Sequence, residues 1–211
     1  ANSRLTVVQS PQNRRFDEPA YLFLTNWLNQ NDNTGHLISP PLLQAAKETA
    51  ALLVATEQDA DRNLKRAVNI YDQLDIRTGG TDSDVVLALA QIADERQKNP
   101  KKSIELYKRL FALTPDTDDT ALQHYARLQQ DTNPAETQKA LQKIKNPTLD
   151  DIRLQIKTGL LLSIDANVDP LINKAAAMID PKEAARLRYE FFKSEDSKTI
   201  ASDRRIAKEI Y

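Results

Sequence analysis

Apolar residues recur three or four positions apart along most of this chain, and polar or charged residues fill the positions between them. This spacing places the apolar side chains on one face of an α-helix. The segments that follow it, and therefore the predicted helices, are about 18–28, 40–58, 61–74, 83–98, 100–112, 117–130, 134–145, 149–165, 170–179, 181–192 and 202–210. Residues 1–16 are polar and basic without a period, so we expect an extended N-terminal arm before one helical domain over residues 17–211.

The composition favours an all-α fold. The 211 residues include only four glycines, fewer than the turns of a β-sheet protein normally need. Good helix formers such as Ala, Leu, Gln, Lys, Glu and Arg dominate instead. We therefore expect an all-α protein of about 11–12 helices.

Prolines divide the helical pattern at nearly constant intervals. Three Asx-Pro pairs lie 34 and 36 residues apart, at Asn99-Pro100, Asn133-Pro134 and Asp169-Pro170. A second set lies 32 and 34 residues apart, at Thr114-Pro115, Asn146-Pro147 and Asp180-Pro181. Asn and Asp are favoured helix N-caps, and Pro is tolerated at the first helical position because its missing N–H would be unpaired there. We interpret the prolines as two interleaved series of helix starts in a repeated helix-turn-helix unit.

Small residues give a second view of the same repeat. They recur at intervals of 35, 36 and 33 residues, at Ala55, Ala90, Ala126 and Gly159. The helices that follow the first two carry matching triplets, Ala67-Tyr71-Leu74 and Ser103-Tyr107-Leu110. In the third unit, Ala135 and Lys139 take the positions of Ser103 and Tyr107, so the aromatic residue is missing.

This pattern resembles the tetratricopeptide repeat, in which a small residue of helix A, an aromatic residue of helix B and a closing Pro recur. The resemblance covers about residues 41–181, and its clearest unit, Val85 to Pro115, needs one extra residue in its A–B turn. It implies a right-handed α–α superhelix, a solenoid of antiparallel helix pairs with flanking capping helices. The alternative is an irregular α-helical bundle in which the proline spacing is accidental.

In such a superhelix the A helices line a concave groove, as the resemblance implies. We expect that groove to bind a protein or peptide partner, because amide and arginine side chains can supply directional hydrogen bonds to an extended peptide or a helix. The outward positions of the A helices, and so the candidate partner-binding residues, are Gln91, Asp94, Glu95, Gln123, Arg127, Gln130, Arg153, Leu160 and Ser163. The clamp that some members use for a C-terminal carboxylate needs Lys and Asn, and Leu52 and Thr56 stand there instead.

Candidate chemistry is sparse. The two histidines, His36 and His124, lie in different units, and no cysteine occurs, so we predict no catalytic, cofactor-binding or metal-binding residue. The acids around residues 57–61 and 116–119 are interpreted as helix-capping residues. The pair Gly79-Gly80 is interpreted as a helix end and not a phosphate-binding loop, since no Gly-Lys-Ser/Thr follows.

Charge and hydropathy narrow the choice of partner. The 29 Lys and Arg residues nearly balance 30 Asp and Glu residues, so neither nucleic acid nor an anionic membrane is predicted as an obligatory partner. No apolar stretch reaches the roughly 18 residues of a membrane-spanning helix. Tyr21, Phe23 and Trp27 form an aromatic stripe that we expect to cap the array, the alternative being an exposed docking patch.

These observations predict a non-catalytic interaction scaffold. The lack of cysteine, an N-terminus that looks processed and the Asn/Gln-rich surfaces favour a bacterial periplasmic or outer-membrane-associated adaptor in envelope assembly, with the cytoplasm as the alternative. The helical pattern that runs to Tyr211 motivates a second hypothesis, a regulatory domain of a larger envelope enzyme, secretion or transport protein. A third is a helical enzyme platform of the cell-wall lytic type.

If Tyr71 and Tyr107 wedge between helix pairs, removing either ring should leave a large cavity. We expect Tyr71→Ala and Tyr107→Ala each to lower the free energy of unfolding by about 3–5 kcal/mol in urea titrations. A loss under about 1 kcal/mol for both variants would contradict the proposed repeat register.

Overall fold

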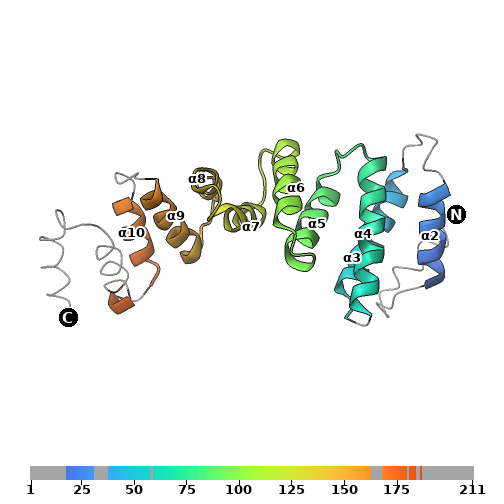
Figure 1. The fold of residues 1–211 in the computed structure, drawn as a ribbon, viewed down its shortest axis with the longest axis horizontal. Helices are drawn as coiled ribbons and strands as arrows, with labels where there is room; N and C mark the ends of the chain where they lie inside the picture. The colour runs from blue at the N-terminus through green and yellow to red at the C-terminus, as the bar shows by residue number, and fades with distance from the viewer. Residues whose placement is uncertain are drawn as a thin grey trace, which may run out of the picture. The chain divides into compact units, whose positions relative to one another are not determined.

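The structure is a computed structural model that describes residues 18–30, 38–57, 59–162, 168–179, 181–183 and 186. All regular secondary structure in these ranges is helical, with no strand among them, which confirms the all-α prediction (Figure 1). The predicted arm over residues 1–16 and the predicted helix over residues 202–210 lie outside the described residues. The chain divides into two compact units, residues 1–116 and 117–211.

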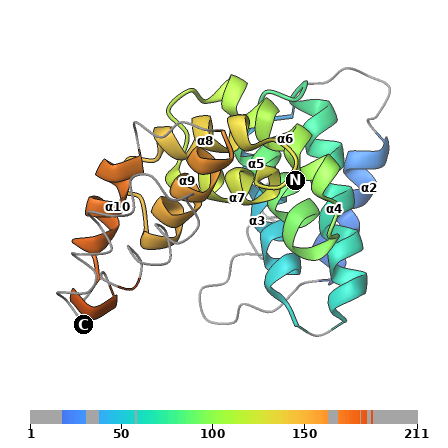
Figure 2. The same cartoon turned by 60° about the vertical axis from the view of Figure 1, so that its left-hand side comes forward.

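The first unit contains five α-helices and one π-helical turn within its described part. They are α2 (Glu18–Gln30), α3 (Pro40–Ala55), α4 (Ala60–Arg77), α5 (Ser83–Gln91), the π-helical η2 (Ile92–Arg96) and α6 (Pro100–Leu113). Helix α3 packs against α4, and α5 together with η2 packs against α6 (Figures 1 and 2). Contacts between α4 and α5 join the two pairs. Apolar side chains fill the interior, and the aromatic rings of Tyr71 and Tyr107 are both buried there.

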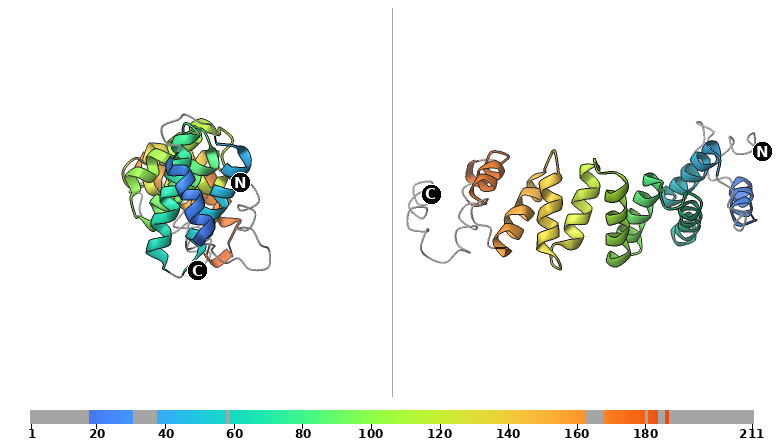
Figure 3. Two further views of the ribbon diagram at one scale, coloured as in Figure 1. Left: turned by 90° about the vertical axis from the view of Figure 1, so that its right-hand side faces the viewer. Right: turned by 90° about the horizontal axis from the view of Figure 1, so that it is seen from above.

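The second unit continues as α7 (Asp119–Gln129), α8 (Pro134–Lys143), α9 (Leu149–Leu161) and α10 (Val168–Ala176). Each of these helices packs against the next one along the chain, as the coloured ribbon also shows (Figure 3). A cluster of Ile152, Ile156, Ile172 and Ala175 forms the core between α9 and α10. In each unit, helices therefore pack mainly against helices that are adjacent in the sequence.

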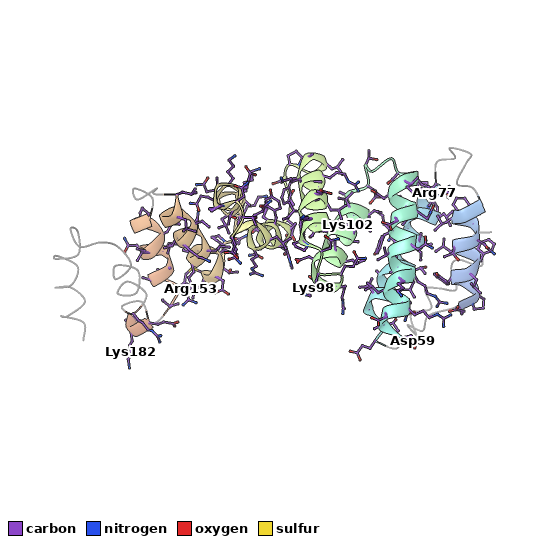
Figure 4. The ribbon with its side chains drawn as sticks, in the orientation of Figure 1. Asp59, Arg77, Lys98, Lys102, Arg153 and Lys182 are labelled. Carbon is purple, nitrogen blue, oxygen red and sulfur yellow. The ribbon has the colours of Figure 1, made fainter. Side chains whose placement is uncertain are left out.

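Two arginines of α4 hold α2 in place. The guanidinium of Arg66 donates to both carboxylate oxygens of Glu18, at 2.8 and 2.5 Å, and lies 4.6 Å from the centre of the Tyr21 ring. The guanidinium of Arg77 lies 5.2 Å from the centre of the Trp27 ring, on the side of α4 that faces α2 (Figure 4). Tyr21 is buried and Trp27 half-buried, so these two aromatic residues pack within the unit, whereas Phe23, the third residue of the predicted stripe, is exposed.

Ion pairs also join the two hairpins of the first unit. Lys47 of α3 lies 2.7 Å from Asp82 and 2.9 Å from Asp84, at the start of α5. Arg109 of α6 lies 2.5 Å from Asp75 of α4. Burial by itself lowers the pKa of the Lys47 ammonium, but its hydrogen bonds to Asp82 and Asp84 outweigh that effect, and the net shift of the pKa is upward.

The first two Asx-Pro pairs begin helices as predicted. The side chain of Asn99 accepts a hydrogen bond from the backbone N–H of Lys102 at 3.1 Å, and that of Asn133 accepts one from Glu136 at 3.2 Å. Both bonds satisfy an N–H that the first helical turn leaves unpaired. The third pair differs, because α10 begins at Val168 and Pro170 lies inside its first turn, where a proline costs no backbone hydrogen bond.

The second proline set does not begin helices at two of its three positions. Pro115 follows Thr114, the C-cap of α6, and α7 starts only at Asp119. Pro147 likewise precedes the start of α9 by two residues. The interpretation of these two prolines as helix starts is wrong. They lie in the turns that follow helices, where a residue that cannot continue a helix is common.

A repeated hydroxyl contact fixes how the two helices of a pair meet. The Ser103 hydroxyl donates to the carbonyl of Ala90 at 3.0 Å. The Thr137 hydroxyl is shared between the carbonyl of Ala126, at 3.4 Å, and that of Asn133 in its own first turn, at 3.1 Å. Each hydroxyl residue is the third after the proline that opens its helix, and both alanines are fully buried. Two of the small residues that recur along the sequence thus allow the helices to approach closely, whereas Ala55, the first of that series, is exposed.

This contact corrects the register of the third unit. Thr137, and not Ala135, matches Ser103, so the residue that matches Tyr107 is Leu141. Leu141 is buried, whereas the side chain of Lys139 is 70% exposed and pairs with Glu136. The predicted alignment of Ala135 and Lys139 is therefore wrong by two residues.

The π-helical turn accommodates the extra residue that the sequence predicts in the A–B turn of the clearest unit. In η2, the N–H of Gln97 donates to the carbonyl of Ile92 at 2.9 Å, five residues back instead of four. A turn closed in this way holds about one residue more than an α-helical turn. Lys98 then adopts a left-handed backbone with φ of 50° before Asn99 caps α6.

The side-chain caps make a prediction that a matched control can test. We expect Asn99→Ala and Asn133→Ala each to lower the free energy of unfolding by about 1 kcal/mol in urea titrations, since each removes the acceptor of an unpaired N–H. Ser39 caps α3 by position but makes no side-chain capping bond, so Ser39→Ala serves as the control. It should change the free energy of unfolding by only a few tenths of a kcal/mol. Equal effects for all three variants would contradict the assigned capping role.

Candidate functional site

Within the described part of the first unit, a surface cavity of about 500 Å³ is a candidate site. Three elements enclose it: the end of α3, the start of α4 and the π-helical turn η2. Its volume lies within the range typical of ligand pockets. The residues that line it are Val54, Ala55, Thr56, Glu57, Ala60, Asp61, Leu64, Glu95 and Arg96. We call it the π-turn cavity.

One wall of the π-turn cavity comes from the turn between α3 and α4. Helix α3 ends at Ala55, and the N–H of its C-cap Thr56 donates to the carbonyl of Leu53 at 3.3 Å. Asp59 then adopts a left-handed backbone with φ of 51° and starts α4 (Figure 4). This tight reversal places Glu57 and Asp61 on opposite ends of the turn, with both side chains lining the cavity.

The facing wall comes from η2. Glu95 and Arg96 are its last two residues, and both are exposed. The side that faces the core carries Ile92 and Ala93, which are buried. The π-helical hydrogen bonds thus leave the packing of the hairpin intact while they direct two charged residues toward α3 and α4.

The charges of the π-turn cavity are unbalanced. Three carboxylates and one guanidinium line it, with Val54, Ala55 and Leu64 supplying apolar surface. Within the described part of the chain, Glu57 and Asp61 form no hydrogen bond or ion pair. An apolar surface with charged groups at its edge suits a ligand that has an apolar stem and a charged end.

The carboxylates of η2 also act on the core tyrosine behind them. Burial raises the pKa of the Tyr107 phenol, and the charges of Asp94 and Glu95 raise it further. Tyr107 therefore stays neutral over the whole physiological range of pH. It stacks on Phe111 at a centroid distance of 6.2 Å, so its role is in packing.

Two acids of the second unit are bonded within the protein. The Asp119 carboxylate accepts the backbone N–H groups of Lys145 and Asn146, both at 2.9 Å, and these bonds lower its pKa. Asp151 is buried and accepts from the backbone and the hydroxyl of Thr148 at 2.8 and 2.7 Å. Asp119 was expected to cap its own helix, but it instead joins the start of α7 to the turn after α8.

Among the predicted groove residues of the first unit, one lines the π-turn cavity. Glu95 forms part of its wall, while Gln91 and Asp94 are half-buried on the same α5–η2 segment. The other wall of the cavity was not predicted from the sequence, because Glu57 and Asp61 are typical helix-capping residues at their positions. The one signal for this site was the extra residue in the A–B turn.

The predicted groove residues of the second unit have different surroundings. Gln123 donates to the Asp151 carboxylate at 2.6 Å, so its amide is engaged inside the unit. Arg153 lies 3.3 Å from Glu183 and 3.6 Å from Asp150 (Figure 4). Arg127 is exposed and Gln130 half-buried. The side chain of Leu160 and all of Ser163 lie outside the described residues.

The Gly79-Gly80 loop ends a helix, as predicted. Both glycines are left-handed, with φ of 61° and 72°, a backbone that residues with a Cβ rarely adopt. The N–H of Gly80 donates to the Asp75 carbonyl at 2.8 Å and that of Gly79 to Ile76 at 3.1 Å. This is the Schellman pattern of a helix C-terminus, and it uses the N–H groups that a phosphate would need.

The described residues contain no group of three or more His, Cys, Asp or Glu side chains that could hold a metal ion. Within the same ranges, no helix is both long enough and apolar enough to cross a membrane. No protein-family model matches the chain, and no curated protein matches it.

Glu57 and Asp61 should contribute little to stability. We expect the double variant Glu57→Gln/Asp61→Asn to change the free energy of unfolding by less than about 0.5 kcal/mol in urea, since no contact is lost. Asp151→Asn, which weakens a buried network, should cost more than about 1 kcal/mol. A comparable loss in both variants would assign Glu57 and Asp61 a structural role.

Proposed function

We propose that this chain is a non-catalytic, tetratricopeptide-like scaffold that binds an extended segment or helix of a partner protein. The observation that carries the proposal is the π-turn cavity, which Glu95 lines from the α5–η2 segment and the end of α3 lines from the preceding hairpin. In the proposed assignment, α3 and α5 are the A helices. A cavity between consecutive A helices is where a groove-bound segment would insert a side chain.

The repeat assignment has support from the helix pairs. Helices pack as hairpins of sequence neighbours, and two hairpins share the hydroxyl-to-carbonyl contact of Ser103 with Ala90 and of Thr137 with Ala126. A contact repeated at matching positions is expected of a repeat and not of an irregular bundle. We therefore propose the right-handed superhelix of antiparallel pairs as the arrangement of these hairpins.

A charge change on the proposed A helices tests the scaffold function. We expect the double variant Gln91→Glu/Arg127→Glu to capture its partner from a lysate of the native organism about tenfold less well than wild type. The reason is that Arg127 is exposed and forms no ion pair within the described residues, so its charge is available to a partner. The readout is quantitative mass spectrometry of proteins retained on the immobilised chain.

The control for that variant carries the same change in charge on a B helix. Gln142 and Lys143 of α8 are both exposed, and their side chains form no hydrogen bond or ion pair within the described residues, so Gln142→Glu/Lys143→Glu should retain the partner fully. Both double variants should melt like wild type. Equal loss of the partner in the two variants would count against a groove on the A helices.

A further inference from the structure

The π-turn cavity has features that specify its occupant. Glu57 and Asp61 on one wall, and Glu95 on the other, give it three carboxylates against the single guanidinium of Arg96. Its remaining surface is largely short aliphatic side chains, with Val54, Ala55 and Leu64 among them. The cavity is therefore apolar in part and carries a net negative charge.

We propose that the π-turn cavity binds the side chain of a lysine or arginine that the partner segment carries. This inference rests on the proposed scaffold function and adds the chemistry of the partner to it. The aliphatic stem of either residue covers the apolar surface, and its cationic end reaches the carboxylates of Glu57 and Asp61. A basic residue thus matches the two kinds of surface in the cavity at once.

The carboxylates are open to such a ligand. Glu57 and Asp61 have no hydrogen-bond or ion-pair partner among the described residues, in contrast to Asp82 and Asp119, which are bonded within the protein. A cation from a partner would therefore replace water and not an existing contact. Charge complementarity of this kind both steers association and fixes register along a groove.

Other occupants fit the cavity less well. An acidic side chain or a C-terminal carboxylate would meet three carboxylates of the same sign. A purely apolar side chain would take water from the carboxylates without giving them a partner, which is unfavourable. The described residues offer no cluster of ligands for a metal ion.

Selection from a peptide library tests this inference. The probe is a phage-displayed library of random twelve-residue peptides, selected on the wild-type chain. We expect one position of the enriched peptides to hold Lys or Arg. Synthetic versions in which norleucine replaces that residue should bind about tenfold more weakly, a change of about 1.4 kcal/mol.

Two variants tie the preference to the cavity. Glu57→Gln/Asp61→Asn should bind the selected peptide about tenfold more weakly and should not distinguish lysine from norleucine. Ala55→Trp should also weaken binding, because Ala55 is an exposed lining residue whose enlargement fills the cavity. Glu105→Gln/Asp118→Asn is the control, since it removes the same charge from two exposed acids outside the cavity.

The outcomes separate the inference from the proposed function. Selected peptides that lack a basic preference, or that bind the Glu57→Gln/Asp61→Asn variant as tightly as wild type, overturn the inference and leave the scaffold function standing. Failure to enrich any peptide contradicts both. A loss of affinity in the control variant equal to that in the cavity variant would show a general effect of charge and would also overturn the inference.

Discussion

The close approach of paired helices at a small buried residue is the constraint on which the rest of the structure depends. At Ala90 and Ala126 the backbone of one helix comes near enough for a hydroxyl of the next to bond its carbonyl. A larger side chain at either position would separate the helices and break the bond. Because this contact ties α5 to α6 and α7 to α8 at a defined point, it helps to decide which residues of the first helix of each of these two pairs reach the surface.

The elements of the fold that the sequence predicted well are those set by local chemistry. Asn99 and Asn133 begin helices through bonds to residues three positions away, and the Gly79-Gly80 turn requires only a backbone that glycine adopts easily. The prediction that Pro115 and Pro147 start helices is wrong because Pro is common both at a helix start and just beyond a helix end. The spacing of prolines alone does not distinguish a helix start from a helix end.

The register of the third unit shows a second reason why the sequence alone does not determine the structure. Ala135 and Thr137 are both small enough to lie at a helix crossing, and the sequence offers no aromatic residue to choose between them. The packing of α8 decides between the two alignments, because Leu141 is buried and Lys139 is exposed. The π-turn cavity was missed for a related reason. Its two walls lie more than thirty residues apart in the sequence, and only tertiary structure brings Glu57 near Glu95.

The acids of this chain fall into two physical classes that look alike in the sequence. Asp82, Asp119 and Asp151 each accept hydrogen bonds or an ion pair that joins two elements, so their charges stabilise the fold. Glu57 and Asp61 accept none within the described residues. The same residue types at similar positions near helix ends therefore differ in their surroundings, and only their partners distinguish them.

The π-helical turn has a consequence for how this surface can change over evolutionary time. The turn lies outside the bond between Ser103 and Ala90, so a change in its length would leave the hairpin core in place. Loss of one residue from η2 would restore an ordinary α-helical turn and withdraw Glu95 and Arg96 from α3 and α4. A single codon gained or lost in this segment can thus change the lining of the cavity without the cost of rebuilding a core.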